Sequence, residues 1–209
     1  MARTKKSNVK KRRSYNKLFL AVALIIIIVA AIGVYFATNQ GTPATFPPTK
    51  VLLQTTAGNI TIDLRTDKPI TSGNFANLVK EGKYDGTIFH RVIAGFMIQG
   101  GQVNGLVPTI KDEIGSNNHN LKYTIAMAKT SEPNSATSEF FINVADNGNL
   151  VVDQAGTKFD SVYAVFGTVI SGQSVVDAIA NAPVMQNPNT HENSSPVNPA
   201  TVTKVIIVP

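Results

Sequence analysis

The sequence predicts a mainly β domain, either a closed antiparallel barrel or a sandwich, preceded by one N-terminal transmembrane helix. Three observations lead to this prediction. Residues 50–209 hold many short runs of β-branched and aliphatic residues, separated by turn-forming residues. Only two stretches in the same part of the chain show the apolar spacing of a helix. Residues 18–37 form an uninterrupted run without a charged side chain.

The N-terminal segment has the pattern of a membrane anchor. Residues 18–37, LFLAVALIIIIVAAIGVYFA, are long enough to cross a hydrocarbon core of ~30 Å as one helix. Residues 1–17 are basic and contain no acidic residue, which holds the N-terminus in the cytoplasm and the remainder outside. We therefore expect a single-pass protein of the cell membrane, with 1–17 as its cytoplasmic tail. The alternative, a cleaved signal peptide, is disfavoured because its apolar part usually has only ~7 to 15 residues.

The net charge of +6 comes from the basic tail, and the rest of the chain is slightly acidic. Eight of the nineteen lysines and arginines lie in residues 1–17, which leaves eleven against thirteen acidic residues in the rest of the chain. The tail suits contact with lipid headgroups, and we expect no nucleic-acid binding. The chain has no cysteine, so the domain must be held together by its apolar core alone.

The first elements after the membrane segment follow from local patterns. Residues 38–49, TNQGTPATFPPT, are uncharged and rich in Thr and Pro, which predicts an extended linker. Residues 50–64, KVLLQTTAGNITIDL, contain two apolar runs on either side of a glycine-containing turn and predict a β-hairpin. In residues 68–84, KPITSGNFANLVKEGKY, Pro69 suits a first helical turn and Gly82 ends the apolar periodicity, so we expect a helix.

The remaining elements are further strands and a second helix. Four runs predict strands: residues 123–128, 139–145, 163–170 and 201–208. Residues 171–181, SGQSVVDAIAN, predict a helix because Val175, Val176 and Ile179 fall on one face. Residues 186–199, QNPNTHENSSPVNP, are expected to form a polar loop.

Residues 87–101, TIFHRVIAGFMIQGG, place an arginine inside an apolar strand-like run. Burying a charge without a partner is costly, so Arg91 needs a partner or a ligand. If the chain bends at Gly95, Arg91 and Gln99 are each four residues from the bend and lie side by side on neighbouring strands. Phe96 then contributes to an apolar surface near the guanidinium. The pattern alone does not decide between a ligand-binding arginine and one paired with a surface carboxylate.

The sequence lacks the usual arrangements of catalytic residues. His90, His119 and His191 are scattered and show no metal-ligand spacing, and there is no thiol, nucleophile elbow or phosphate-binding glycine loop. Asp112 and Glu113 are adjacent, which suits a solvated pair better than an acid and a base acting together. Hydrolysis, redox chemistry and phosphoryl transfer are therefore disfavoured, and we expect neither a metal nor a cofactor.

Three segments resemble the signature segments of the cyclophilins, a family of peptidyl-prolyl cis-trans isomerases. They are YDGTIFHRVIAGFMIQGG (84–101), AMAKTSEPNSATSEFFINVADN (126–147) and YAVFGTVISG (163–172), and the likeness extends over residues 50–209. The resemblance implies an eight-stranded antiparallel β-barrel capped by two α-helices, with its groove on the outer face. It implies an isomerase that acts on X-Pro bonds. Together with the membrane segment, this predicts a tethered enzyme, expected to be monomeric, that acts on unfolded or exported polypeptides.

The resemblance also assigns the site residues. It implies that Arg91 is the catalytic arginine and that Gln99 helps to position it and the substrate. Eight further residues are implied to bind substrate: Phe96, Met97, Ala128, Lys129, Glu139, Phe141, Leu150 and Tyr163. Glu139 stands where the family usually has glutamine, and its carboxylate could pair with Arg91. An alternative function is therefore a weakly catalytic or non-catalytic module that binds proline-containing peptides at the membrane.

Overall fold

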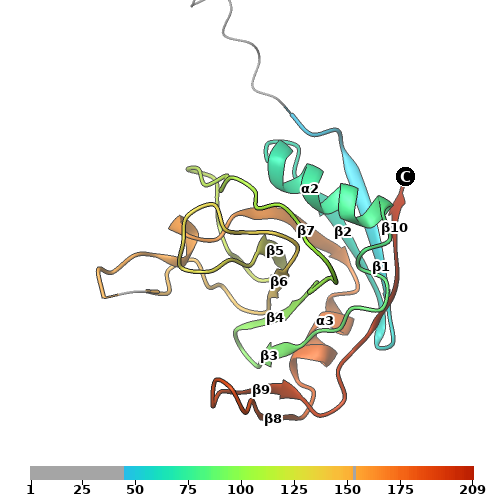
Figure 1. Cartoon of the computed structure of the whole chain (residues 1–209), viewed down its shortest axis with the longest axis vertical. Coiled ribbons are helices and arrows are strands. Elements are labelled where there is room, and N and C mark those ends of the chain that lie inside the picture. Colours follow the sequence, from blue (N-terminus) through green and yellow to red (C-terminus); the bar gives the residue numbers. More distant parts are fainter. Residues whose placement is uncertain (1–44, 153) are drawn as a thin grey trace, which may run out of the picture. The chain divides into compact units, whose positions relative to one another are not determined.

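The computed structural model describes residues 45–152 and 154–209, and residues 45–209 form one compact unit (Figure 1). The predicted cytoplasmic tail and membrane anchor, together with residues 38–44 of the predicted linker, lie outside the described residues. No helix within the described part of the chain is long and apolar enough to cross a membrane.

Eight strands form one antiparallel sheet in the order β10-β1-β2-β7-β5-β6-β4-β3. The strands are β1 (Thr49–Thr55), β2 (Gly58–Leu64), β3 (Arg91–Ile93), β4 (Met97–Gly100), β5 (Thr124–Met127), β6 (Phe140–Asn143), β7 (Val165–Ser171) and β10 (Val202–Val208). The predicted hairpin in residues 50–64 is present as β1 and β2, and the later predicted strands correspond to β5, β6, β7 and β10.

The resemblance predicted a closed barrel, and this prediction is wrong. The sheet curls into a half-barrel and is not closed. Its two edge strands, β3 and β10, share no ladder, and only an isolated bridge joins Ile88 to Thr201. β3 has only three residues, which pair with β4 along one edge. The approach to the β10 side is made before β3 begins, where the Val202 N–H donates to the Thr87 carbonyl oxygen at 2.8 Å.

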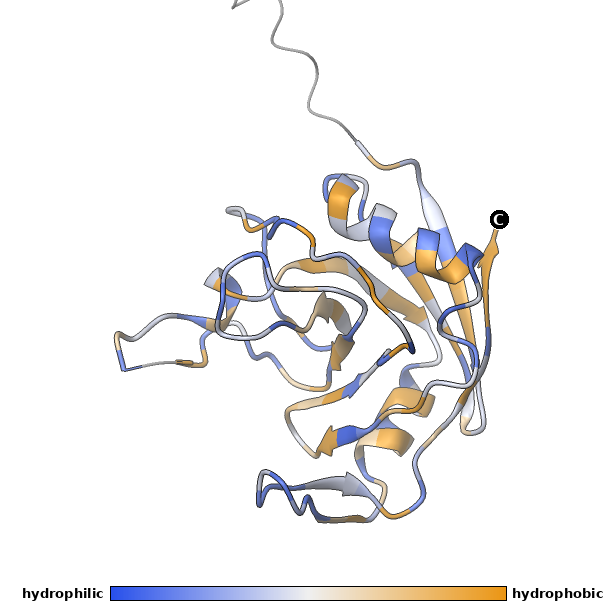
Figure 2. Cartoon of the chain, in the orientation of Figure 1, coloured by the Kyte–Doolittle hydropathy of each residue, from blue (hydrophilic) through white to orange (hydrophobic). Residues whose placement is uncertain are grey.

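Both predicted helices are present, α2 (Pro69–Lys80) and α3 (Gln173–Ala180), and a short 3-10 helix η1 (Phe159–Ser161) precedes β7. Apolar residues of both helices belong to the same buried core as those of the strands. Figure 2 shows hydrophobic residues along the strands and hydrophobic and hydrophilic residues alternating along the helices. Phe75 of α2 lies at the centre of this core, with ring centroids 5.0 to 5.6 Å from those of Tyr84, Phe140 and Phe166.

The start of α2 is stabilised from a distant loop. Lys68 at the N-cap position makes no side-chain cap. Glu113 replaces it, because its Oε2 accepts hydrogen bonds of 2.7 Å from both the N–H and the hydroxyl of Thr71, and its Oε1 accepts one of 3.2 Å from the Ile70 N–H. A carboxylate at this end of the helix also interacts favourably with the helix dipole. The carboxylate of Glu113 therefore has a structural role as the cap of α2.

The prediction of a polar loop at residues 186–199 is also partly wrong, because part of this segment forms a β-hairpin. Strands β8 (Val184–Gln186) and β9 (Asn193–Pro196) pair antiparallel, and β9 lies beside β3 (Figure 1). The turn between them is closed by backbone hydrogen bonds: the Asn187 N–H donates to the Glu192 carbonyl at 2.7 Å and the His191 N–H to the Asn187 carbonyl at 2.8 Å. Such bonds are independent of the side chains, which is why the composition of the segment predicted only a loop.

Candidate active site

The bend at Gly95 brings Arg91 and Gln99 together as the sequence predicts. Gly95 has φ +72°, a left-handed conformation that favours glycine, and residues 94–96 form the turn between β3 and β4. In the ladder Arg91 lies opposite Gln99. The Nη1 of Arg91 donates to Oε1 of Gln99 at 3.4 Å, which is a long hydrogen bond.

The carboxylate that pairs with Arg91 belongs to Glu192, and the pairing with Glu139 that the sequence left open is not formed. The Nε of Arg91 donates to Oε2 of Glu192 at 2.7 Å, and its Nη2 donates to Oε1 at 2.8 Å. The guanidinium holds the pKa of Glu192 below its ordinary value of 4.5. The side chains of Arg91 and Glu192 are each about one third exposed, so the ion pair lies at the protein surface.

Glu139 interacts with Gln99 and His90. The Nε2 of Gln99 donates to Oε2 of Glu139 at 2.8 Å, and Nε2 of His90 lies 3.4 Å from the same oxygen. Hydrogen bonding from His90 and from Gln99 keeps the pKa of Glu139 below its ordinary value, in spite of partial burial. Because the amide nitrogen of Gln99 faces this carboxylate, its amide oxygen is turned towards Arg91.

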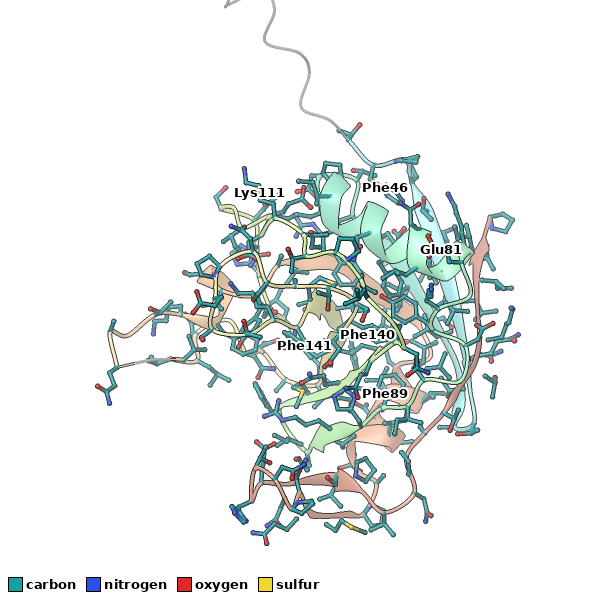
Figure 3. The ribbon with its side chains drawn as sticks, viewed as in Figure 1. Phe46, Glu81, Phe89, Lys111, Phe140 and Phe141 are labelled. Carbon is teal, nitrogen blue, oxygen red and sulfur yellow. The ribbon has the colours of Figure 1, made fainter. Side chains whose placement is uncertain are left out.

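A second group of residues forms an apolar surface beside Arg91, which we call the aromatic cluster. Its buried members are Met97, Ala126, Phe141, Phe159 and Val165, and its partly exposed members are Ile93, Phe96, Ala128 and Tyr163. The consecutive residues Phe140 and Phe141 of β6, labelled in Figure 3, divide between the two apolar groups, because Phe140 belongs to the main core. The Sδ of Met97 lies 3.8 Å from Nη1 of Arg91, so the guanidinium borders the cluster.

Two further residues lie at or near the aromatic cluster. Leu150, expected in the proline pocket, is 45% exposed and is not a member of the cluster. Phe159, which the analysis missed, is 5% exposed, and its ring centroid lies 5.6 Å from those of Phe96 and Phe141 and 4.4 Å from that of Tyr163. The only signal for Phe159 was an apolar ring four residues before Tyr163.

The other expected substrate-binding residues line a pocket of about 200 Å³ next to Gln99. The residues around it are Gln99, Ala128, Lys129, Thr130, Ser135, Thr137 and Glu139. Lys129 is held at its wall, because its Nζ donates to Oδ2 of Asp112 at 2.8 Å. The charge of Lys129 is therefore already balanced, and the carboxylate of Glu139 is the acidic group of this pocket.

The arrangement offers a cationic hydrogen-bond donor at the edge of an apolar aromatic surface, with a polar pocket on the far side of Gln99. None of these side chains is placed as a nucleophile activated by a base. In the described part of the chain, no group of three or more His, Cys, Asp or Glu side chains is arranged to hold a metal ion. The site is suited to binding a chain segment that has an apolar ring next to a hydrogen-bond acceptor.

The sequence of this chain is similar to a known family of proteins. Residues 50–206 match the family model for cyclophilin type peptidyl-prolyl cis-trans isomerase/CLD. A peptidyl-prolyl cis-trans isomerase of Acinetobacter baylyi is 49% identical over 142 residues, which cover 65% of this chain and 73% of that relative. Peptidyl-prolyl cis-trans isomerase A of Dickeya dadantii is 43% identical over 172 residues, covering 79% of this chain and 85% of the relative.

Solved structures of a cyclophilin type peptidyl-prolyl cis-trans isomerase from Cryptosporidium parvum have the same fold. One crystal structure is 24% identical with a TM-score of 0.65, and covers 78% of this chain and 98% of the solved chain. A second, in the presence of the dipeptide Ala-Pro, is 25% identical with a TM-score of 0.63, and covers 77% and 99%.

Proposed function

The chain belongs to the cyclophilin type peptidyl-prolyl cis-trans isomerases, and we propose that Arg91 and the aromatic cluster together carry out its reaction. The observation that supports this division of labour is the position of Nη1 of Arg91, which lies between Oε1 of Gln99 and Sδ of Met97. Both contacts are long, so this nitrogen can turn to a substrate without losing a strong hydrogen bond.

Rotation about an X-Pro bond needs no bond to be made or broken. Its barrier of ~18 to 20 kcal/mol arises because rotation interrupts the amide resonance. In the twisted state the prolyl nitrogen becomes pyramidal and accepts a hydrogen bond, which it does not do in the planar amide. A donation from Arg91 to that nitrogen is therefore strongest in the transition state, and lowers the barrier by differential binding.

The aromatic cluster is proposed to hold the proline ring while the preceding carbonyl group rotates. The partly buried rings of Phe96 and Tyr163 offer an apolar surface, and the buried side chains of Met97 and Phe141 pack with them in the same cluster. Gln99 holds the guanidinium from the pocket side. The polar pocket beside Gln99, walled by Ala128 and Lys129, is in position to receive the residues before the proline.

The proposed substrates are proline-containing segments of unfolded or exported polypeptides, and the proposed place of action is the outer side of the cell membrane. The support for this location is the basic tail and the uncharged run of residues 18–37. A tether would raise the local concentration of the enzyme where chains emerge. Cell fractionation tests it: the full-length protein should stay with the membranes after a high-salt wash and be digested by protease added from outside. Recovery in the soluble fraction would contradict the tether.

The mechanism is tested by following cis-to-trans relaxation of a short X-Pro peptide with the purified full-length protein. A hydrogen bond to a charged group contributes about 1.5 to 3 kcal/mol, so Arg91→Ala should lower kcat/KM roughly 10- to 150-fold. Arg65 provides the matched control, because its guanidinium makes a similar two-point contact with Asp67, at 2.9 and 2.6 Å. Arg65→Ala should leave kcat/KM unchanged. Full activity of Arg91→Ala would refute the role of the arginine.

A second candidate function has support from one observation. Both Arg91 and Gln99 already contact a carboxylate, that of Glu192 and that of Glu139 respectively. If these contacts persist when a peptide binds, the domain would bind proline-containing segments with little catalysis. Saturable binding of the X-Pro peptide, measured by a change in tyrosine fluorescence, without acceleration of its relaxation would favour this function over the isomerase mechanism.

A further inference from the structure

The two edges of the Arg91 guanidinium face different surroundings. One edge, formed by Nε and Nη2, is occupied by the carboxylate of Glu192 through two hydrogen bonds of 2.7 and 2.8 Å. The other edge carries Nη1, which lies towards Gln99 and Met97 with contacts of 3.4 and 3.8 Å. The strong contacts are therefore on the side away from the aromatic cluster, and the weak ones are on the side that borders it.

Glu192 is itself held in place by its own backbone and its hairpin. It is the last residue before β9, and its carbonyl oxygen accepts a hydrogen bond from the Asn187 N–H at 2.7 Å. Within the same turn, Nε2 of Gln186 donates to the His191 carbonyl at 3.0 Å, and Oδ1 of Asn187 accepts from the Asn189 N–H at 2.9 Å. The hairpin lies against β3, the strand that carries Arg91.

An arginine on its own would be poorly defined in this position. β3 is an edge strand of three residues, and the arginine side chain has several rotatable bonds that lose entropy when they become fixed. A planar two-point contact with a carboxylate fixes both the direction and the plane of the guanidinium. Fixing it in the free enzyme means that this ordering does not have to occur in the transition state.

We infer that Glu192 is a positioning residue for Arg91, which orients the guanidinium so that Nη1 is directed at the substrate. The inference rests on the proposed function, in which Arg91 is the donor. Arginine keeps its proton beside a carboxylate, so the pairing does not remove the N–H donors of Nη1. It does offset the positive charge, so Arg91 acts on substrate as a directed hydrogen-bond donor rather than as a free cation.

The test compares Glu192→Ala, Glu192→Gln and the control Asn189→Ala in the peptide assay, with the full-length protein. Asn189 is exposed in the same turn and takes part in it through its backbone N–H, which Asn189→Ala keeps, so this variant controls for a substitution in the hairpin itself. Glu192→Ala should lower kcat about ten-fold with KM within two-fold, because a misplaced donor impairs the reaction rather than binding. Glu192→Gln keeps one acceptor oxygen and should recover part of the rate. Asn189→Ala should match the wild type.

A double-mutant cycle shows whether Glu192 acts through Arg91. In the Arg91→Ala background, Glu192→Ala should cause no further loss. The Nε–H resonance of Arg91 in ¹H–¹⁵N spectra should shift in Glu192→Ala and keep its wild-type position in Asn189→Ala. These spectra report the ion pair whether or not the enzyme is active.

Three results would overturn the inference. A higher kcat/KM for Glu192→Ala would mean that the carboxylate blocks the arginine, and an unchanged kcat would mean that the pairing has no role. An equal loss in the Arg91→Ala background would mean that Glu192 acts by another route. Failure of the proposed function has a different signature, since Arg91→Ala would then retain wild-type activity.

Discussion

Phe159 allows a quantitative test of the aromatic cluster, because a matched residue exists in the main core. Its ring lies near three others, those of Phe96, Phe141 and Tyr163. The ring of Phe75 also has three neighbours, and it is fully buried away from the cluster. Each such pair contributes about 0.5 to 1.5 kcal/mol beyond the burial of apolar area. Phe159→Leu and Phe75→Leu should therefore each lower the free energy of unfolding by about 1.5 to 4.5 kcal/mol.

The two substitutions should differ in their effect on activity. For a domain of this size, 1 kcal/mol corresponds to a fall in Tm of about 2 to 4 °C, so both Tm values should fall by roughly 3 to 18 °C in calorimetry. Only Phe159→Leu loosens the support under Phe96 and Phe141, and a loss of ~1 kcal/mol of contact with the proline ring would raise KM about five-fold. The peptide assay is run well below both Tm values. An unchanged KM for Phe159→Leu, or an equal rise for Phe75→Leu, would refute the role of the cluster.

Three further predictions concern stability. Glu113→Gln should lower the free energy of unfolding in urea by about 1 to 2 kcal/mol, because it weakens the charge-assisted hydrogen bonds that cap α2, and an unchanged midpoint would contradict the cap. The pKa of Glu139 is lower in the folded protein than its ordinary value of 4.5, so its contribution to stability is present above that pH and is lost as the pH falls. The stability of the wild type should therefore decline more steeply below pH 4.5 than that of Glu139→Gln, and parallel acid profiles would disagree. Gly101→Ala should destabilise the protein by about 2 to 5 kcal/mol, because the residue has φ +79° and a Cβ there would lie 2.6 Å from the Phe140 ring; a Tm within 1 °C of the wild type would show that the backbone adapts.

The features that could be predicted from the sequence are those fixed by short-range patterns. The hairpin of β3 and β4 is an example, because a glycine bend and the two-residue period of a strand are enough to set Arg91 opposite Gln99. The two helices follow in the same way from apolar spacing and from Pro69 at the first turn. The approximate number of strands also followed from local runs, whereas the open edge of the sheet depends on how residues far apart in the chain meet.

The features that were missed depend on contacts between distant parts of the chain. Phe159 joins the aromatic cluster from a 3-10 helix, and its spacing of four residues from Tyr163 was too weak a signal to predict that position. The hairpin of β8 and β9 is closed by backbone hydrogen bonds in a segment whose composition is typical of a loop. The substrate-binding role of Leu150 stays a prediction, because the residue is 45% exposed and its backbone carbonyl accepts a hydrogen bond from the Phe159 N–H at 2.9 Å, beside the cluster.

Which carboxylate pairs with Arg91 decides which edge of its guanidinium is occupied. From the sequence, a carboxylate partner for Arg91 was one of two alternatives, and Glu139, 48 residues away, was the candidate; in the structure the partner is Glu192, 101 residues away. The two choices have opposite consequences. If Glu139 paired with Arg91 from its position beside Gln99, it would meet the edge of the guanidinium that borders the aromatic cluster, where it would compete with substrate. Glu192 approaches from the hairpin and occupies the other edge, so the same ion pair can orient the donor instead of blocking it.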